Sequence, residues 1–197
     1  MANLKLKNPS GGSLNFVSAD GASDLTVTFP ATTGTAMVSG NMPAASVYMA
    51  NTMNGVSSDV FTKVQFDTKV FDTATCFNNT GSTVTLNGLS VPSYSFCPNV
   101  AGYYQVTMNM DYFGTTSGLN ITQQIYKNGA RHTQNYFYSS VLNSGGYEFP
   151  QTLGALVYLN GTGDYLNGYL QFNNGSSIQI YGGQPGTRFD AICVRTA

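Results

Sequence analysis

The stretch Phe96–Tyr112, FCPNVAGYYQVTMNMDY, carries the clearest conformational signal in the chain. After Gly102 its apolar side chains fall at every second position, which gives Tyr104, Val106, Met108, Met110 and Tyr112. The residues between them are polar: Gln105, Thr107, Asn109 and Asp111. Such alternation is typical of a strand with one face in a core and one face in water. It predicts the central strand of an all-β domain, and the rest of the chain must surround it.

The composition agrees with an all-β protein. Only 9% of the 197 residues are charged, whereas 22 are Gly, 13 are Tyr and 12 are Phe. These are turn formers and β-formers, with almost no Lys- and Glu-rich helix surface. The formal net charge of −1 disfavours nucleic-acid binding, because nothing here can track a phosphate backbone. So few charges fit a protein that buries much of its outside between subunits or that works outside a cell.

The first residues predict no export. Met1–Lys7 lacks the apolar segment of a secretory signal, and no run of the chain approaches the length of a membrane span. We therefore expect synthesis in the cytoplasm and no membrane insertion. Of the three cysteines, Cys76 and Cys97 could pair across neighbouring strands. Buried reduced thiols are favoured instead, because disulfides are rare in proteins made in the cytosol.

Residues 1–40 form a segment distinct from the rest. Short β-prone pieces (residues 14–17, 25–29 and 36–38) alternate with turns rich in Gly, Ser, Asp and Pro. Three pieces of about five residues cannot close a core alone. They need the main domain, copies of themselves in an oligomer, or a larger assembly. The alternative is a disordered tail, against which the clean alternation of residues 25–29 argues.

Residues 43–197 predict about ten strands at a spacing of about 8–12 residues, with no long helical period. Turn signals such as Asn87-Gly88 and Asn128-Gly129 separate them. This pattern predicts an antiparallel two-sheet sandwich or jelly roll. Within it, Val64, Phe66 and Val70 are predicted to share a face, with an irregularity near Thr68 that fits a bend or a bulge, and Asn78–Ser95 is predicted to contain an inserted hairpin. Residues 41–58 fit either a short helix or an extended segment.

Several late strands are apolar on both faces. Only one face of each sheet meets the core of a two-layer sandwich, so the second apolar face needs another partner. Six residues are therefore candidates for a subunit interface: Leu156, Tyr158, Tyr165, Tyr169, Ile192 and Val194.

The spacing of Phe66, Asp72 and Phe77, followed by Phe96, Gly102 and Tyr104, is similar to the signature of the complement C1q-type globular head, a jelly roll of the tumour necrosis factor superfamily. Tyr126–Gly129, Gly163-Asp164 and Arg188–Ala191 also resemble segments of that family, and the match covers about 43–197. Two features depart from its pattern: the inserted residues 78–95, and the absence of a collagen-like stalk. With them the chain looks like the versions found in phage fibres and virion appendages.

The resemblance implies a homotrimer around a threefold axis, a strand within residues 41–58, and loops at one end that bind a ligand. Asp72 falls on a framework position, where capping a turn is its expected role. Some members bind calcium near the trimer apex, but no Asp cluster here allows that site to be carried over.

No catalytic site is expected. Glu148 is the only glutamate and His132 the only histidine, and neither stands in a motif for acid–base or nucleophilic catalysis. The sequence shows no spacing typical of metal ligands and no phosphate-binding loop, so we expect no cofactor and no metal.

The resulting hypothesis is a structural virion protein, made in the host cytoplasm and located in the virion. It would be a homotrimeric fibre, tail-tip or capsid-decoration component, with residues 43–197 as the projecting head. Residues 1–40 would attach it to other virion proteins or intertwine the three chains. The alternative is a lectin-like adhesin that recognises host surface glycans through a loop with Asn135, Tyr136 and Tyr138. An enzyme that degrades a surface polymer is a third reading, which the missing pair of acids disfavours.

Overall fold

The computed structural model describes residues 4–7, 10–11, 13–16, 42–114, 119–139, 147–173 and 177–196. The chain divides into two units, residues 1–34 and 35–197. In the first unit, β1 (Leu4–Lys7) pairs antiparallel with β2 (Ser13–Phe16). The predicted β-prone pieces at residues 25–29 and 36–38 lie outside the described residues.

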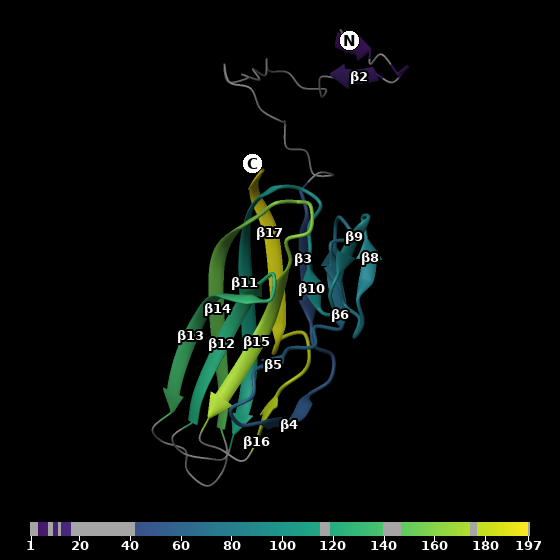
Figure 1. The fold of residues 1–197 in the computed structure, drawn as a ribbon. Coiled ribbons are helices and arrows are strands. Elements are labelled where there is room, and N and C mark those ends of the chain that lie inside the picture. The colour runs from purple at the N-terminus through teal and green to yellow at the C-terminus, as the bar shows by residue number, and fades with distance from the viewer. Residues whose placement is uncertain are drawn as a thin grey trace, which may run out of the picture. The chain divides into compact units, whose positions relative to one another are not determined.

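Two sheets face each other in the second unit (Figure 1). The seven-stranded sheet contains β3 (Ala44–Tyr48), β4 (Met53–Ser57), β6 (Thr68–Asp72), β11 (Gly102–Gly114), β14 (Tyr147–Leu159), β16 (Ser177–Ile180) and β17 (Arg188–Thr196). The six-stranded sheet contains β5 (Thr62–Lys63), β7 (Phe77–Asn78), β10 (Ser95–Phe96), β12 (Leu119–Lys127), β13 (Ala130–Ser139) and β15 (Leu166–Asn173). All pairs in both sheets are antiparallel, so the predicted two-sheet sandwich is confirmed.

The predicted central strand is β11. It pairs with β14 along one edge and with β17 and β16 along the other. All five of its predicted core residues, from Tyr104 to Tyr112, are at most 1% exposed, while the polar residues between them remain accessible. Alternation had predicted which face is buried, and the prediction is correct at each of these positions.

The two sheets pack closely where β11 passes β15. A Cβ atom added to Gly168 would lie 2.5 Å from the Sδ of Met108 and 2.9 Å from a ring carbon of Phe66. Any larger residue at this position would push the sheets apart, because protein interiors have no spare volume. Nearby, the ring of Phe189 lies 5.6 Å from Phe66 and 5.9 Å from Phe77, measured between ring centroids.

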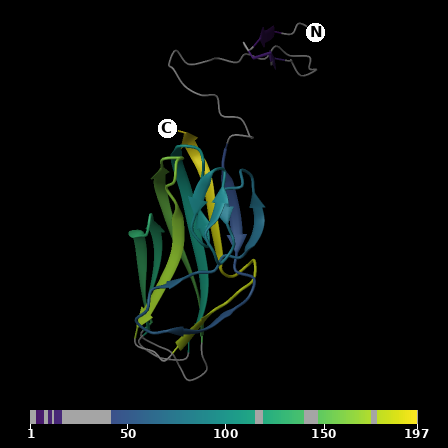
Figure 2. The ribbon, with the colours of Figure 1, turned by 45° about the vertical axis from the view of Figure 1, so that its right-hand side comes forward.

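The predicted inserted hairpin is also present. It consists of β8 (Val84–Leu86) and β9 (Leu89–Val91), and it lies outside the two main sheets in both views (Figures 1 and 2). Asn87 and Gly88 join the strands with φ angles of 50° and 77°. A tight turn with two left-handed residues favours this Asn-Gly pair.

Residues 41–58 form no helix where they are described, since they contain β3 and β4. One prediction is wrong: Val64 and Phe66 are buried, but Val70 is 44% exposed. The chain leaves the six-stranded sheet after β5 and joins the seven-stranded sheet at β6. The residues between the two strands are not extended in one sheet, so alternation cannot be counted across them.

The variant Val106→Asp tests the assignment of the buried face. It places an unpaired carboxylate in the core, and we expect the free energy of unfolding to fall by about 4 kcal/mol or more. Asn109→Asp is the matched control, because it adds the same charge to the outer face of the same strand and should change stability by less than about 0.5 kcal/mol. Denaturant unfolding followed by circular dichroism measures both. Equal stability of the two variants would show that the faces are assigned wrongly.

Candidate functional site

Large apolar side chains lie exposed together on the outer face of the seven-stranded sheet. On β14, Leu156 is 58% exposed, and on β17, Ile192 is 50% exposed. Both are paired with Gln105 of β11, one on each side of it. Exposed apolar groups that cluster in this way mark an interaction surface more often than isolated ones do. We call this cluster the apolar patch; it contains Tyr103, Leu156, Tyr158, Ile192 and Val194.

A β-bulge shapes the apolar patch. Tyr103 pairs with Arg195 and Tyr104 with Cys193, so Val194 has no partner residue on β11. The patch has an open hollow of about 360 Å³, lined by Tyr103, Leu156, Val194 and Arg195. Bulges of this kind redirect side chains at the ends of sheets.

Lys127 closes one margin of the apolar patch. Its Nζ donates a hydrogen bond to the backbone oxygen of Tyr158 at 2.8 Å, lies 5.8 Å from the centroid of the Tyr158 ring, and forms an ion pair with Asp164 at 2.9 Å. Burial alone would raise the pKa of Asp164, but hydrogen bonds from Asn128, Lys127 and the Asn160 N–H together lower it. The carboxylate therefore stays charged and holds the β12–β13 turn against the loop before β15.

Four of the six predicted interface residues lie in the apolar patch, and two do not. Leu156, Tyr158, Ile192 and Val194 belong to strands that flank β11, whereas Tyr165 and Tyr169 belong to the six-stranded sheet or the loop before it. The ring of Tyr169 stacks on that of Tyr126 at 4.3 Å between centroids. These two tyrosines lie apart from the other four because β15 pairs with β12 in the six-stranded sheet, where Tyr169 points outward and Tyr165 directly precedes the strand.

Sequence reasoning missed Tyr103. It stands on the polar side of β11, and only its lateral pairing with Tyr158, at 5.4 Å between ring centroids, makes it part of an apolar cluster. Nothing local to Tyr103 signals that pairing.

The predicted ligand residues do not lie in a loop. Asn135, Tyr136 and Tyr138 all belong to β13, a strand at the edge of the six-stranded sheet. The Nδ2 of Asn135 donates to the backbone oxygen of Thr152 on β14 at 3.1 Å, so this side chain bridges the two sheets. Tyr136 and Tyr138 are 62% and 58% exposed. The prediction of a ligand loop at these residues is therefore wrong, because residues 135–138 continue the alternation of a strand.

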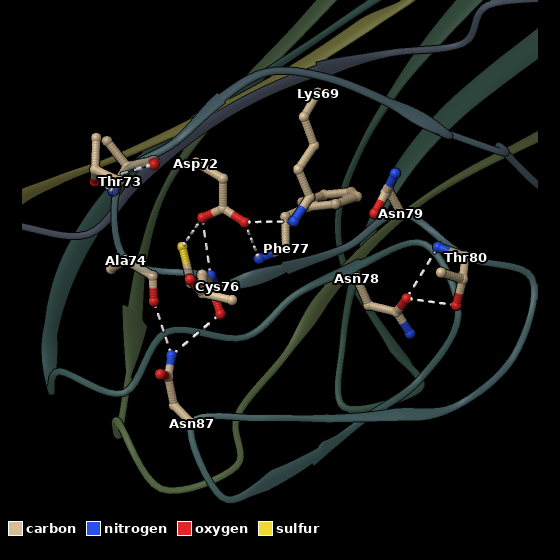
Figure 3. Close-up of polar contacts among 12 residues, drawn as sticks. Lys69, Asp72, Thr73, Ala74, Cys76, Phe77, Asn78, Asn79, Thr80 and Asn87 are labelled. Carbon is tan, nitrogen blue, oxygen red and sulfur yellow. Dashed lines mark hydrogen bonds and ion pairs between the residues drawn. The ribbon is translucent and has the colours of Figure 1, made fainter.

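Asp72 caps a turn, as expected (Figure 3). One carboxylate oxygen accepts hydrogen bonds from the backbone N–H of Cys76 at 2.8 Å and from its thiol at 3.2 Å. The other accepts from the N–H of Phe77 at 3.1 Å and from the Nζ of Lys69 at 2.7 Å. The carboxylate thus fixes the step by which the chain passes from β6 in one sheet to β7 in the other.

The three cysteines are free and buried, so Cys76 and Cys97 form no disulfide. Cys76 and Cys97 are hydrogen-bonded through the backbone instead, because the N–H of Cys97 donates to the carbonyl oxygen of Cys76 at 2.7 Å. Burial, helped by the charge of Asp164, raises the pKa of Cys97 to about 11. A thiol with so high a pKa is a poor nucleophile at neutral pH.

Catalytic groups do not gather in the part of the chain that the structure describes. His132 lies exposed on β13. Among the described residues, no three His, Cys, Asp or Glu side chains lie close enough to hold a metal ion. The same residues contain no helix long and apolar enough to cross a membrane.

Comparisons with known proteins give a match at the level of structure. No family model matches the sequence, and no curated protein does. The tumour necrosis factor Eiger from S. frugiperda matches with a TM-score of 0.52 and 15% identity, over 80% of this chain and 95% of that chain. Murine APRIL matches with a TM-score of 0.52 and 12% identity, over 78% and 99%.

The globular domain of the zebrafish complement 1qA protein matches with a TM-score of 0.49 and 15% identity, over 79% of this chain and 98% of that one. The likeness to Eiger and APRIL is one of fold. It supports the jelly-roll topology that the sequence predicted, and at this level of identity it says nothing about a ligand.

The variant Asp72→Asn tests the turn cap. It removes the ion pair and one strong acceptor, and we expect the free energy of unfolding to fall by about 2 kcal/mol. The control is Asp190→Asn, which breaks an exposed pair with Arg188 and should cost less than about 0.5 kcal/mol. Chemical denaturation at neutral pH measures both losses, and an equal loss in the two variants would contradict a special role for Asp72.

The stabilisation that Asp72 provides should depend on pH. Burial alone would raise the pKa of Asp72, but its hydrogen bonds from Lys69, Cys76 and Phe77 outweigh burial, so the folded-state pKa lies below the ordinary value of about 3.9. The stabilisation is therefore fully present above about pH 4 and is lost as the pH falls through the folded-state pKa. The stability difference between wild type and Asp72→Asn should shrink in that acidic range. A constant difference down to acid unfolding would contradict it.

Proposed function

We propose that the chain is a structural virion protein that assembles as a homotrimer. Residues 43–197 form its projecting head, and residues 1–40 attach it to other virion proteins. The observation that carries the proposal is the apolar patch on the outer face of the seven-stranded sheet. The low content of charged residues agrees with a protein that buries much of its outer surface. The resemblance of its sequence to the heads of phage fibres supports the virion setting.

The chemistry of the apolar patch suits contact between subunits. Its centre holds aliphatic and tyrosine side chains, and its margins hold Lys127 and Arg195. Stable interfaces have this arrangement of an apolar centre and a polar rim. The hollow between Tyr103 and Val194 can receive a side chain from the next subunit. Three copies around an axis close the assembly, so no patch is left exposed.

Light scattering of the purified chain at micromolar concentration tests the trimer. The wild type should have three times the chain mass of 21.0 kDa. Ile192→Lys and Leu156→Lys each place a charge in the interface and should yield a folded monomer. Val60→Lys is the matched control, because Val60 is 51% exposed and lies outside the patch; this variant should remain a trimer. A monomeric wild type would overturn the proposal.

The location in a particle needs a separate test. Mass spectrometry of purified particles from the source of the chain should find it, and a density map should place its jelly roll at a fibre, a tail tip or a capsid vertex. Particles that lack the chain would rule out the virion role and leave the trimer untouched.

A second function is a lectin-like adhesin that recognises surface glycans. The observation that favours it is the exposure of Tyr136 and Tyr138 side by side on an edge strand. An enzymatic function has no comparable support, since the described residues offer no paired acids and no activated nucleophile.

A further inference from the structure

The outward side of β12 carries only neutral polar residues. Asn120, Thr122 and Gln124 alternate along this strand with side chains that point into the sandwich. The strand lies between β13 and β15, so these three residues form the middle column of the outer face of the six-stranded sheet.

The two neighbouring strands repeat this chemistry in register. On β13, the residues paired with these three are Tyr138, Tyr136 and Gln134. On β15, they are Asn173, Gln171 and Tyr169. We call these nine positions the polar face. From strand geometry it measures about 14 Å along the strands and about 10 Å across them, and it contains only Asn, Gln, Thr and Tyr.

The amides of the polar face are linked across strands, and two of their oxygens are left over. The Nδ2 of Asn120 donates to the Oδ1 of Asn173 at 2.6 Å, and the Nε2 of Gln124 lies 3.5 Å from the Oε1 of Gln134. The Oδ1 of Asn120 and the Oε1 of Gln124 accept no hydrogen bond, although Gln124 is only 1% exposed. Buried amide oxygens are nearly always paired. Asn120 is partly exposed, so a rotation of its amide would offer the oxygen to a hydroxyl group of a ligand.

Tyr136 and Tyr138 add flat aromatic surface to one edge of the polar face. A tyrosine ring gives an apolar platform with a polar tip. Sugar rings have the complementary chemistry: their C–H faces pack on aromatic rings, and their hydroxyls donate to and accept from amides. Tyr and Asn are likewise the residues that recognition loops use for adaptable contacts with little loss of entropy.

The charge of the polar face narrows the class of ligand. None of its nine residues is charged, so a nucleic acid or an acidic glycan would find no counter-charge within it; Arg131 is exposed one row beyond, paired with Tyr126. Lys63 borders the face, but its Nζ donates to the backbone oxygen of Ser93 at 3.3 Å and lies over the Tyr169 ring at 5.7 Å. A protein partner would favour an apolar centre, which is absent.

We propose that the polar face binds a neutral oligosaccharide. The inference rests on the second function proposed above and gives it a site and a ligand class. It does not depend on the trimer, because the apolar patch lies on the outer side of the other sheet.

The test is binding of the full chain to an array of neutral polymers (glucans, mannans, galactans and N-acetylglucosamine polymers) and acidic ones (sialylated and uronic acid polymers). The wild type should bind at least one neutral polymer and no acidic one. The double variant Tyr136→Ser with Tyr138→Ser should bind it at least tenfold more weakly by titration calorimetry. Gln171→Glu should also bind the polymer more weakly, because it places a charge at the centre of the β15 edge of the polar face, beside Thr122.

The matched control is Phe71→Ser, which removes a 47% exposed aromatic ring from β6, an edge strand of the other sheet. It should bind like the wild type. Three results would overturn the inference: no binding to any neutral polymer, preference for acidic polymers, or equal affinity of the double variant and the wild type. Light scattering of each sample shows whether a loss of glycan binding comes from a loss of the trimer. Ile192→Lys should be a monomer that still binds the neutral polymer, and its affinity should fall only by the gain that several linked sites provide.

Discussion

The packing of β11 against β15 is the contact on which the rest of the structure depends. Its five buried side chains, each contributing about 1.5–3 kcal/mol through removal from water, lie on a strand that is paired along both edges. The contact is possible because Gly168 has no side chain where Met108 and Phe66 approach it. The strands that pair with β11 and β15 are in register with them. The side chains that point inward on these two strands therefore determine which side chains point inward on their neighbours.

That orientation gives the domain two unlike outer surfaces. On the seven-stranded sheet, the strands beside β11 send Leu156 and Ile192 outward. On the six-stranded sheet, the strands beside β12 send amides and tyrosines outward. An apolar surface is stabilised by burial against another protein, whereas a neutral polar surface gains little from such burial. The two surfaces are therefore suited to different partners, and occupying one leaves the other open.

The sequence was most informative for long strands. Alternation predicted the buried face of β11, because this strand stays in one sheet over many residues. It failed for Val70, since the chain changes sheets between Phe66 and Thr68. It also could not separate Tyr169 from Leu156: both were predicted to point outward, and both do, but the sheet to which each strand belongs depends on pairing between residues far apart in the chain. Tyr103 and the amides of the polar face were missed for the same reason.

The inserted hairpin is held to one end of the six-stranded sheet by side-chain amides. Asn78 of β7 donates through its Nδ2 to the backbone oxygens of Ser82, Val91 and Pro92, which ties the hairpin to the strand at one end of the sheet. Asn167 of β15 donates to Ser93, Tyr94 and Ser95 and so binds the segment that returns from the hairpin.

Side-chain amides thus tie the insertion to the end of the sheet formed by β7 and β10, with Val91 as its one fully buried apolar residue among those described. At the other end of the sheet, Tyr136, Tyr138 and Asn173 are exposed. The Nδ2 groups of Asn78 and Asn167 find partners in the chain itself, whereas three amide oxygens on β12, those of Asn120, Gln123 and Gln124, accept no hydrogen bond from the described residues. Those of Asn120 and Gln124 lie on the outward side of the strand, and this is the physical reason to look for an external ligand there.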